Sequence, residues 1–168
     1  MVVRILHFLR REKVLYSEPH RQLSALKRGR HAMSEEYEVK NDLLYTRDHE
    51  WLKTDNKHAL MGITDYAQKS LHEIIYVELP NVNQRVKQAE PLGSVESVKA
   101  TSDILSPISG RIVEVNNTLM DSPEVINESP YEDGWILRIE IARQSELENL
   151  MDPEEYRRYL DELEEQEE

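Results

Sequence analysis

The chain has 168 residues, enough for one ordinary domain with tails, and 39% of them are hydrophobic against 32% charged. The complete lack of cysteine excludes disulfides, thiolate metal sites and thiol nucleophiles. No apolar run approaches the roughly 18 residues of a membrane-spanning helix, and the six histidines show no metal-ligand spacing. We therefore expect no membrane segment and no metal site.

The formal net charge of −12 is unevenly distributed along the chain. Residues 1–32 hold eight lysines and arginines against two glutamates, so residues 33–168 carry all of the acidic excess. The acidic part repels nucleic acids and anionic membranes, so we expect neither as a partner. Such a surface suits docking on basic patches of protein partners, although solubility alone also explains it.

Residues 1–32 have the composition of a basic extension rather than of part of the fold. A short apolar patch precedes a basic stretch, as in an arginine-rich organellar transit peptide. Alternatively, translation starts at Met33, because Met33-Ser34-Glu35-Glu36-Tyr37 looks like a natural bacterial start, and we favour this second interpretation. The sequence thus predicts a disordered extension, 1–32, and a folded domain, 33–168. The expected compartment is the bacterial cytoplasm or, with a transit peptide, the mitochondrial matrix.

The folded part begins with a pattern of strands. Asp48–Leu52 predicts the entry of a strand, Lys53–Lys57 is polar and typical of a turn, and His58–Ile63 predicts a second strand. Asp65 and Gln68 then have the spacing of a capping box, which predicts a short helix.

After this helix, which should end at about Ser70, Leu71–Leu79 has the period-two alternation of a half-buried strand. Its expected inward-facing residues are Ile75, Val77 and Leu79. The segment 82–141 predicts several more short strands separated by turn residues, with the last strand beginning at Trp135. Short strands at this spacing are typical of an all-β sandwich or barrel.

The C-terminus is predicted to be helical and to end in an acidic tail. Ser145 with Glu148, and Asp152 with Glu155, have capping-box spacing, and Pro153 occupies the favoured first helical position. An apolar stripe follows on one helical face and is expected to pack on the β core. The stripe consists of Tyr156, Tyr159, Leu160 and Leu163.

The segment 93–110 predicts a hairpin with Lys99 at its tip. Ala100 leaves the ammonium group approachable, and Glu96 and Asp103 flank it with negative charge. A rigid hairpin presents such an amine to a modifying enzyme without a costly rearrangement. From the residues alone, however, a lysine in a polar turn is usually just a solvated surface charge.

The residues around Lys99 also resemble a known motif. Glu96-Ser97-Val98-Lys99-Ala100, Ser102-Asp103 and Ser106-Pro107-Ile108-Ser109-Gly110 closely resemble the lipoyl-attachment signature of glycine cleavage H proteins. Further blocks follow the order of that family, and the resemblance covers about residues 40–163. These blocks are His49-Glu50-Trp51, Gly62-Ile63-Thr64-Asp65-Tyr66-Ala67-Gln68, Tyr76-Val77-Glu78-Leu79-Pro80, Asn127-Glu128-Ser129-Pro130-Tyr131 and Gly134-Trp135.

The resemblance implies a mainly β fold, a barrel-sandwich hybrid of two small antiparallel sheets with short helices and a helical C-terminus. It also implies a monomeric, non-catalytic carrier whose Lys99 bears lipoic acid. The lipoyl group would take the aminomethyl unit from a pyridoxal-phosphate-dependent glycine decarboxylase. The arm would deliver this unit to a tetrahydrofolate-dependent aminomethyltransferase. Dihydrolipoyl dehydrogenase would then reoxidise the resulting dithiol of the lipoyl group. A lipoyl ligase or transferase would attach it.

Two acidic residues, Glu50 and Asp103, match positions that the family associates with a cleft for the loaded arm. Hydrogen bonding at the hairpin and at a strand end is the alternative role for both. The family pattern is not kept everywhere, because Tyr66 replaces a usual His or Phe. His72, Asn83 and Ala89 replace usual glycines. Asparagine tolerates positive φ better than alanine does, so a local difference is expected near Ala89.

Other functions are weaker fits to the sequence. Biotin domains usually flank their lysine with methionines, whereas Val98 and Ala100 do so here. Lipoyl domains of 2-oxo-acid dehydrogenases usually have an acidic residue before the lysine and lie inside longer chains. An H-like lipoyl relay outside glycine catabolism is the remaining alternative. No nucleophile–base motif predicts an enzyme with its own catalytic site.

Overall fold

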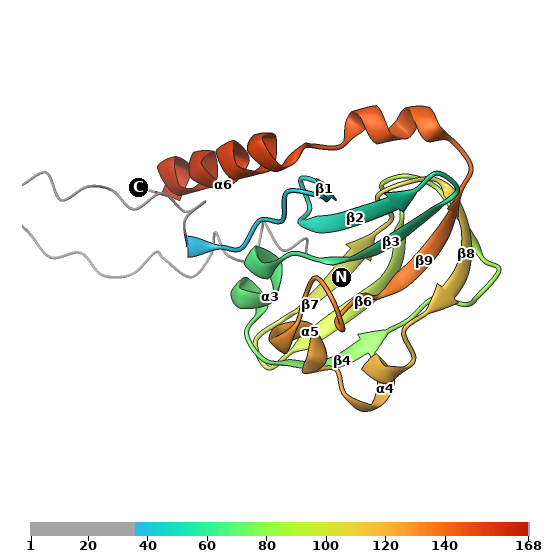
Figure 1. The fold of residues 1–168 in the computed structure, drawn as a ribbon. Helices are drawn as coiled ribbons and strands as arrows, with labels where there is room; N and C mark the ends of the chain where they lie inside the picture. Colours follow the sequence, from blue (N-terminus) through green and yellow to red (C-terminus); the bar gives the residue numbers. More distant parts are fainter. Residues whose placement is uncertain (1–35, 168) are drawn as a thin grey trace, which may run out of the picture.

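The structure is a computed structural model that describes residues 36–167. The predicted extension, 1–32, lies outside the described residues. Nine strands form two antiparallel sheets among residues 36–167, so the predicted mainly β fold is confirmed (Figure 1). The larger sheet has the order β1-β2-β3-β9-β8-β5 and the smaller one the order β4-β6-β7, and neither closes into a barrel.

The strands and helices have the following bounds. The larger sheet contains β1 (Leu44–Tyr45), β2 (Glu50–Asp55), β3 (His58–Ile63), β5 (Arg85–Val86), β8 (Gly110–Val115) and β9 (Leu137–Ile141). The smaller sheet contains β4 (Ile74–Glu78), β6 (Pro91–Ser97) and β7 (Thr101–Leu105). The helices are α3 (Asp65–Leu71), α4 (Thr118–Asp121), α5 (Val125–Glu128), the 3-10 helix η1 (Gln144–Asn149) and α6 (Pro153–Glu167).

The main hydrophobic core includes the inward faces of the two sheets. Met61 and Ile139 contribute from the larger sheet, and Val95 and Ile104 from the smaller one; each is at most 1% exposed. Full burial of each such side chain stabilises the fold by roughly 1.5–3 kcal/mol. This core therefore holds β6 and β7, the predicted lysine hairpin, against the rest of the molecule.

A second, aromatic cluster attaches α6 to the sheets. Tyr156 and Leu160 are fully buried, and the Tyr156 ring stacks on Tyr45 at a centroid distance of 4.3 Å. Tyr159 and Leu163 are partly buried in the same cluster, so the predicted packing of the stripe is confirmed. In Figure 1, α6 lies beside β1 and extends past the sheets.

The predicted start of α6 is also confirmed. The Asp152 amide donates to Glu155 Oε2 at 2.9 Å, and the Glu155 amide donates to Asp152 Oδ1 at 2.8 Å. This reciprocal pair is a complete capping box. The other predicted box, Ser145 with Glu148, is wrong: residues 144–149 form η1, which has no side-chain cap.

The N-cap of α3 lies one residue earlier than predicted. Thr64, not Asp65, is the N-cap, and its Oγ1 accepts a hydrogen bond from the Ala67 amide at 3.2 Å. Asp65 is the first helical residue, and it accepts a bond from the Gln68 side chain at 2.7 Å. Threonine and aspartate are both favoured N-cap residues, so the sequence does not decide which of these two adjacent residues is the cap.

Strand boundaries and phases also differ from the prediction in three places. An irregular register in β4 turns Ile74 inward and leaves Ile75 49% exposed, so the expected burial of Ile75 is wrong. β2 continues to Asp55, because Lys53–Asp55 pair with β3 instead of forming the predicted turn. β9 starts at Leu137 rather than at Trp135.

The three residues that replace usual glycines all have positive φ. The angle is 65° at His72, 74° at Asn83 and 67° at Ala89. The expectation that alanine would avoid this conformation at position 89 is therefore wrong. Strain at such a residue persists because the surrounding structure determines the backbone: the Ala89 amide donates to the Ser106 carbonyl at 2.7 Å.

We expect Ala89→Gly to stabilise the protein by about 0.5–1 kcal/mol. Glycine removes the left-handed strain of about 1–2 kcal/mol, which exceeds the added entropy of the unfolded chain. The free energy of unfolding from urea titrations would measure this. Ala142→Gly is the matched control, because Ala142 is exposed and lacks positive φ. Equal destabilisation by both substitutions would contradict the strain at residue 89.

Candidate functional site

The hairpin of β6 and β7 places Lys99 at its tip, as the sequence predicts. Ser94 pairs with Asp103, and Glu96 pairs with Thr101. The Ser97 amide then donates to the Ala100 carbonyl at 2.8 Å, which closes the turn. The Lys99 side chain is exposed at this turn.

The Ser97 hydroxyl group organises the backbone of the tip. It accepts hydrogen bonds from the amides of Lys99 at 3.1 Å and Ala100 at 3.0 Å. The Val98 amide donates to the Glu73 carbonyl at 3.1 Å, which attaches the tip to the segment before β4. The turn is therefore fixed while the Val98 side chain stays 62% exposed. The role of Ser97 is not among the sequence-based expectations, although a hydroxyl residue at the start of a turn is a recognised signal.

The two acidic neighbours of Lys99 lie on the outward face of the small sheet. Val95 and Ser102 pair with each other and face the core, so Glu96 and Asp103, each adjacent to one of them along its strand, face outward. Glu96 is exposed and Asp103 is half-buried. Asp103 lies nearer to the base of the hairpin, because it pairs with Ser94 rather than with Glu96.

Glu50 lies at the opposite end of the hairpin from Lys99. Its carboxyl group is buried and accepts a hydrogen bond from the Leu105 amide at 3.0 Å, and Thr46 Oγ1 donates to its other oxygen. The seven residues from Lys99 to Leu105 span roughly 15–20 Å of strand and turn. Of its two expected roles, the structure shows the hydrogen bond at a strand end. Burial raises the pKa of Glu50 to about 7 against the lowering effect of these hydrogen bonds.

His49 is buried beside Glu50 and connects α6 with α3. Its Nδ1 lies 2.8 Å from the Tyr156 hydroxyl group, which lies 2.9 Å from Thr64 Oγ1. Burial lowers the pKa of His49 to about 3, so the imidazole is neutral. Tyr66, the residue that replaces a usual His or Phe, packs its ring 4.4 Å from the His49 ring.

The chemistry of this arrangement is that of an acyl acceptor on a fixed support. The tip offers an exposed primary amine on a turn whose backbone is already hydrogen-bonded. Within residues 36–167, no group of three or more histidines or carboxylates is placed to hold a metal ion. The described helices also include none long and apolar enough to cross a membrane.

Comparisons with known proteins agree on one family. A family model described as glycine cleavage H-protein matches residues 43–163. The glycine cleavage system H protein of Halothermothrix orenii is 48% identical over 126 residues, which are 75% of this chain and 98% of that protein. The mitochondrial glycine cleavage system H protein 2 of Arabidopsis thaliana is 47% identical over 143 residues, 85% of this chain and 88% of that protein.

A solved structure supports the same match. The crystal structure of a glycine cleavage system H protein from Mycobacterium marinum superposes with a TM-score of 0.60 at 34% identity. The match covers 66% of this chain and 97% of that chain. The relatives thus match the described domain almost over their own full lengths.

We expect Glu50→Gln to change how stability depends on pH. The pKa of Glu50 is about 7 in the folded chain against its ordinary value of 4.5, so folding favours its protonated form. The contribution of this raised pKa to the free energy of unfolding is complete below pH 4.5 and is lost as the pH rises through 7. The stability of the variant relative to the wild type should therefore rise by roughly 3 kcal/mol between pH 4.5 and 8.

Urea titrations at several pH values would measure this difference. Glu96→Gln is the control, because it removes an exposed carboxyl group from the same hairpin. A Glu50→Gln difference that stays constant from pH 4.5 to 8 would contradict the buried, protonated state of Glu50.

We expect Ser97→Ala to loosen the tip without unfolding the domain. The amides of Lys99 and Ala100 would lose their acceptor, and their hydrogen-exchange protection should fall about tenfold. Ser94→Ala is the control, because the Ser94 hydroxyl group bonds only the outward Glu78 side chain. If both variants changed the exchange at residues 99 and 100 equally, Ser97 would not organise the turn.

Proposed function

The chain belongs to the glycine cleavage H-protein family, and on that premise we propose that Lys99 is its lipoyl attachment site. Its function is that of the lipoyl carrier of the glycine cleavage system. The relatives do not favour a relay outside glycine catabolism. The observation that carries the assignment to Lys99 is the exposed amine on a hydrogen-bonded hairpin tip.

The residues around Lys99 fit a covalently attached arm. The amine is exposed, Ala100 is small, and the Ser97 hydroxyl group holds the backbone of the turn. An attaching enzyme can therefore acylate the amine without distorting the fold. The attached lipoyl group supplies the dithiol–disulfide chemistry, since the chain has no cysteine of its own.

The outward face of the small sheet supports docking of protein partners near the arm. Glu78 and Glu96 face outward there, and Tyr76 is 54% exposed beside them. An acidic face with exposed apolar groups suits basic surfaces on other proteins. We propose as partners the glycine decarboxylase, the aminomethyltransferase, dihydrolipoyl dehydrogenase and a lipoyl ligase or transferase. The chain then acts as a non-catalytic carrier that positions the arm.

The two carboxyl groups have different places in this proposal. Asp103 lies on the outward face of β7, between the tip and the base of the hairpin, where an arm from Lys99 can approach it. Glu50 affects the arm indirectly. Its carboxyl group accepts a hydrogen bond from the Leu105 amide and so fixes the position of β7. The relatives come from bacteria and from plant mitochondria, and the compartment of this chain stays a prediction.

We expect Lys99→Arg to abolish lipoylation while the fold is kept. Arginine retains the positive charge but offers no amine that can be acylated. Intact mass measurement and peptide mapping after incubation with lipoate and an attaching enzyme would show the result. Lys57→Arg is the matched control, because Lys57 is also an exposed lysine between two paired strands. A lipoyl mass increment on Lys99→Arg would overturn the assignment.

A further inference from the structure

A cavity of about 560 Å³ lies between β5, β8 and the segment that follows β9. Its walls belong to paired strands: Val86 pairs with Gly110, and Gly110 pairs with Ile141. The Ser109 hydroxyl group also accepts a hydrogen bond from the Gln88 amide at 2.9 Å. The shape of the cavity is therefore fixed by the sheet and is present without a ligand.

The cavity gathers basic residues that are far apart in the sequence. Arg85, Lys87, Arg111 and Arg143 line it. Two carboxylates line it as well: Glu140 is paired with a cation, whereas Glu146 is hydrogen-bonded to neutral groups and keeps its charge. Glu140 lies 2.5 Å from Arg111 Nη2, and Glu146 accepts bonds from the Ser109 amide at 2.7 Å and from its hydroxyl group at 2.8 Å.

The remaining cationic groups have no protein partner. Within residues 36–167, the side chains of Arg85, Lys87 and Arg143 make no hydrogen bond and no ion pair. Four cations against two carboxylates give the lining a formal net charge of +2 in a chain of formal net charge −12, so positive charge gathers there on the unpaired cations. Their mutual repulsion is relieved when an anion lies among them.

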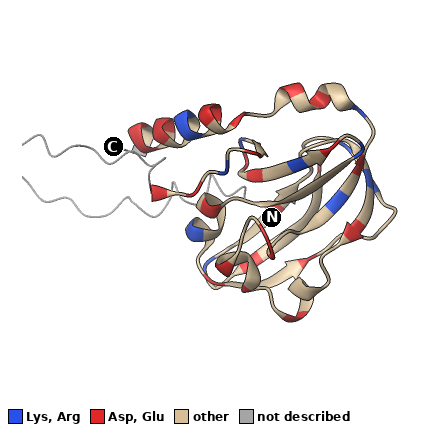
Figure 2. Ribbon diagram, in the orientation of Figure 1, with Lys and Arg blue, Asp and Glu red and all other residues tan. Residues whose placement is uncertain are grey.

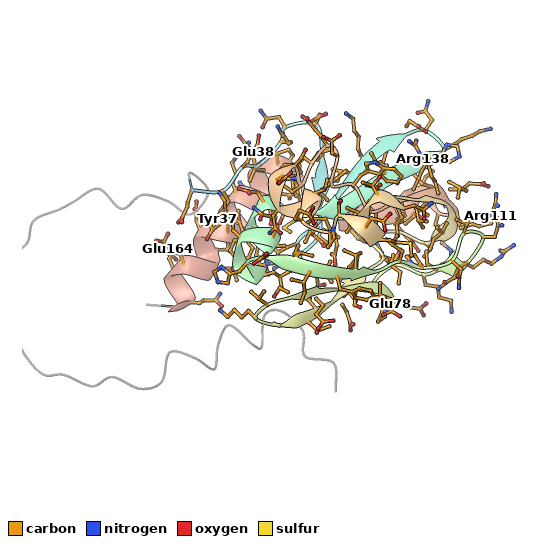
Figure 3. The ribbon with its side chains drawn as sticks, turned by 90° about the horizontal axis from the view of Figure 1, so that it is seen from below. Tyr37, Glu38, Glu78, Arg111, Arg138 and Glu164 are labelled. Carbon is orange, nitrogen blue, oxygen red and sulfur yellow. The ribbon has the colours of Figure 1, made fainter. Side chains whose placement is uncertain are left out.

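The cavity is remote from the lysine hairpin. The tip contacts Glu73, just after α3, whereas β8 lies at the other end of the molecule in Figure 1. Figure 2 shows mainly acidic residues on α6 and both basic and acidic residues on the strands at the opposite end. In Figure 3, Arg111 and Arg138 lie at that end, away from Tyr37 and Glu164. A ligand in the cavity would leave Lys99 accessible.

We propose that this cavity binds a multiply charged small anion of the phosphate or carboxylate class. Its volume is that of a small-molecule site, for which about 300–1,000 Å³ is usual. Arginine side chains bind the oxygens of phosphate and carboxylate groups in pairs, which suits a ligand with several such groups. The proposal does not depend on the lipoylation of Lys99.

The test uses the full chain labelled with ¹⁵N, titrated separately with tripolyphosphate and with citrate at constant ionic strength. We expect saturable chemical-shift changes confined to residues 85–88, 109–111 and 140–146. The anion that binds more tightly identifies the phosphate or the carboxylate source. The triple variant Arg85→Gln, Lys87→Gln, Arg143→Gln should bind this anion at least about tenfold more weakly.

The control variant removes three positive charges outside the cavity: Lys53→Gln, Lys57→Gln and Arg138→Gln. Its affinity should stay within about twofold of the wild type, because long-range charge effects are screened by salt. Equal weakening in both triple variants, shifts spread over the surface, or no saturation with either anion would each overturn the proposal. An unchanged spectrum of each variant without anion confirms that its fold is intact.

Discussion

The buried carboxyl group of Glu50 joins the two sheets at the edge where they meet. Glu50 is the first residue of β2 in the larger sheet. Its carboxyl group accepts a hydrogen bond from the Leu105 amide at the end of β7 in the smaller sheet. Burying a carboxyl group is unfavourable unless it is hydrogen-bonded or neutralised; here it is hydrogen-bonded, and its raised pKa favours the neutral form. Because β7 is fixed at this end and the tip is fixed by Ser97 and Glu73, the hairpin has little freedom of its own. Lys99 is thus presented by a support anchored at both ends.

Patterns that depend on neighbouring residues could be predicted from the sequence. The hairpin around Lys99 lies between turn residues, with strand-like residues on either side of the lysine, so its position followed from local signals. The capping box of α6 requires only Asp152 and Glu155, and His58–Ile63 is a strand with its predicted bounds. The site could be located because its chemistry is carried by one contiguous segment and supported by family blocks elsewhere in the chain.

Features that depend on distant contacts or on ambiguous neighbours could not be predicted. Ile74 and Ile75 satisfy either phase of β4, and only packing in the folded chain decides which one faces the core. The left-handed conformation of Ala89 opposes the preference of alanine and is imposed by a hydrogen bond to Ser106. The cationic cavity combines residues from 85 to 143, which come together only through the pairing of β5, β8 and β9. No local pattern in the sequence predicts that these distant residues lie together.

The adjacent buried groups of His49 and Glu50 have a consequence for the proton balance of folding. Folding lowers the pKa of His49 from 6.5 to about 3 and raises that of Glu50 from 4.5 to about 7. Between pH 4.5 and 6.5 the unfolded chain therefore holds a proton on residue 49, and the folded chain holds one on residue 50. Folding transfers a proton between neighbouring residues with no net exchange with the solvent from this pair. In calorimetry, the pair adds no dependence of the unfolding enthalpy on the ionisation enthalpy of the buffer.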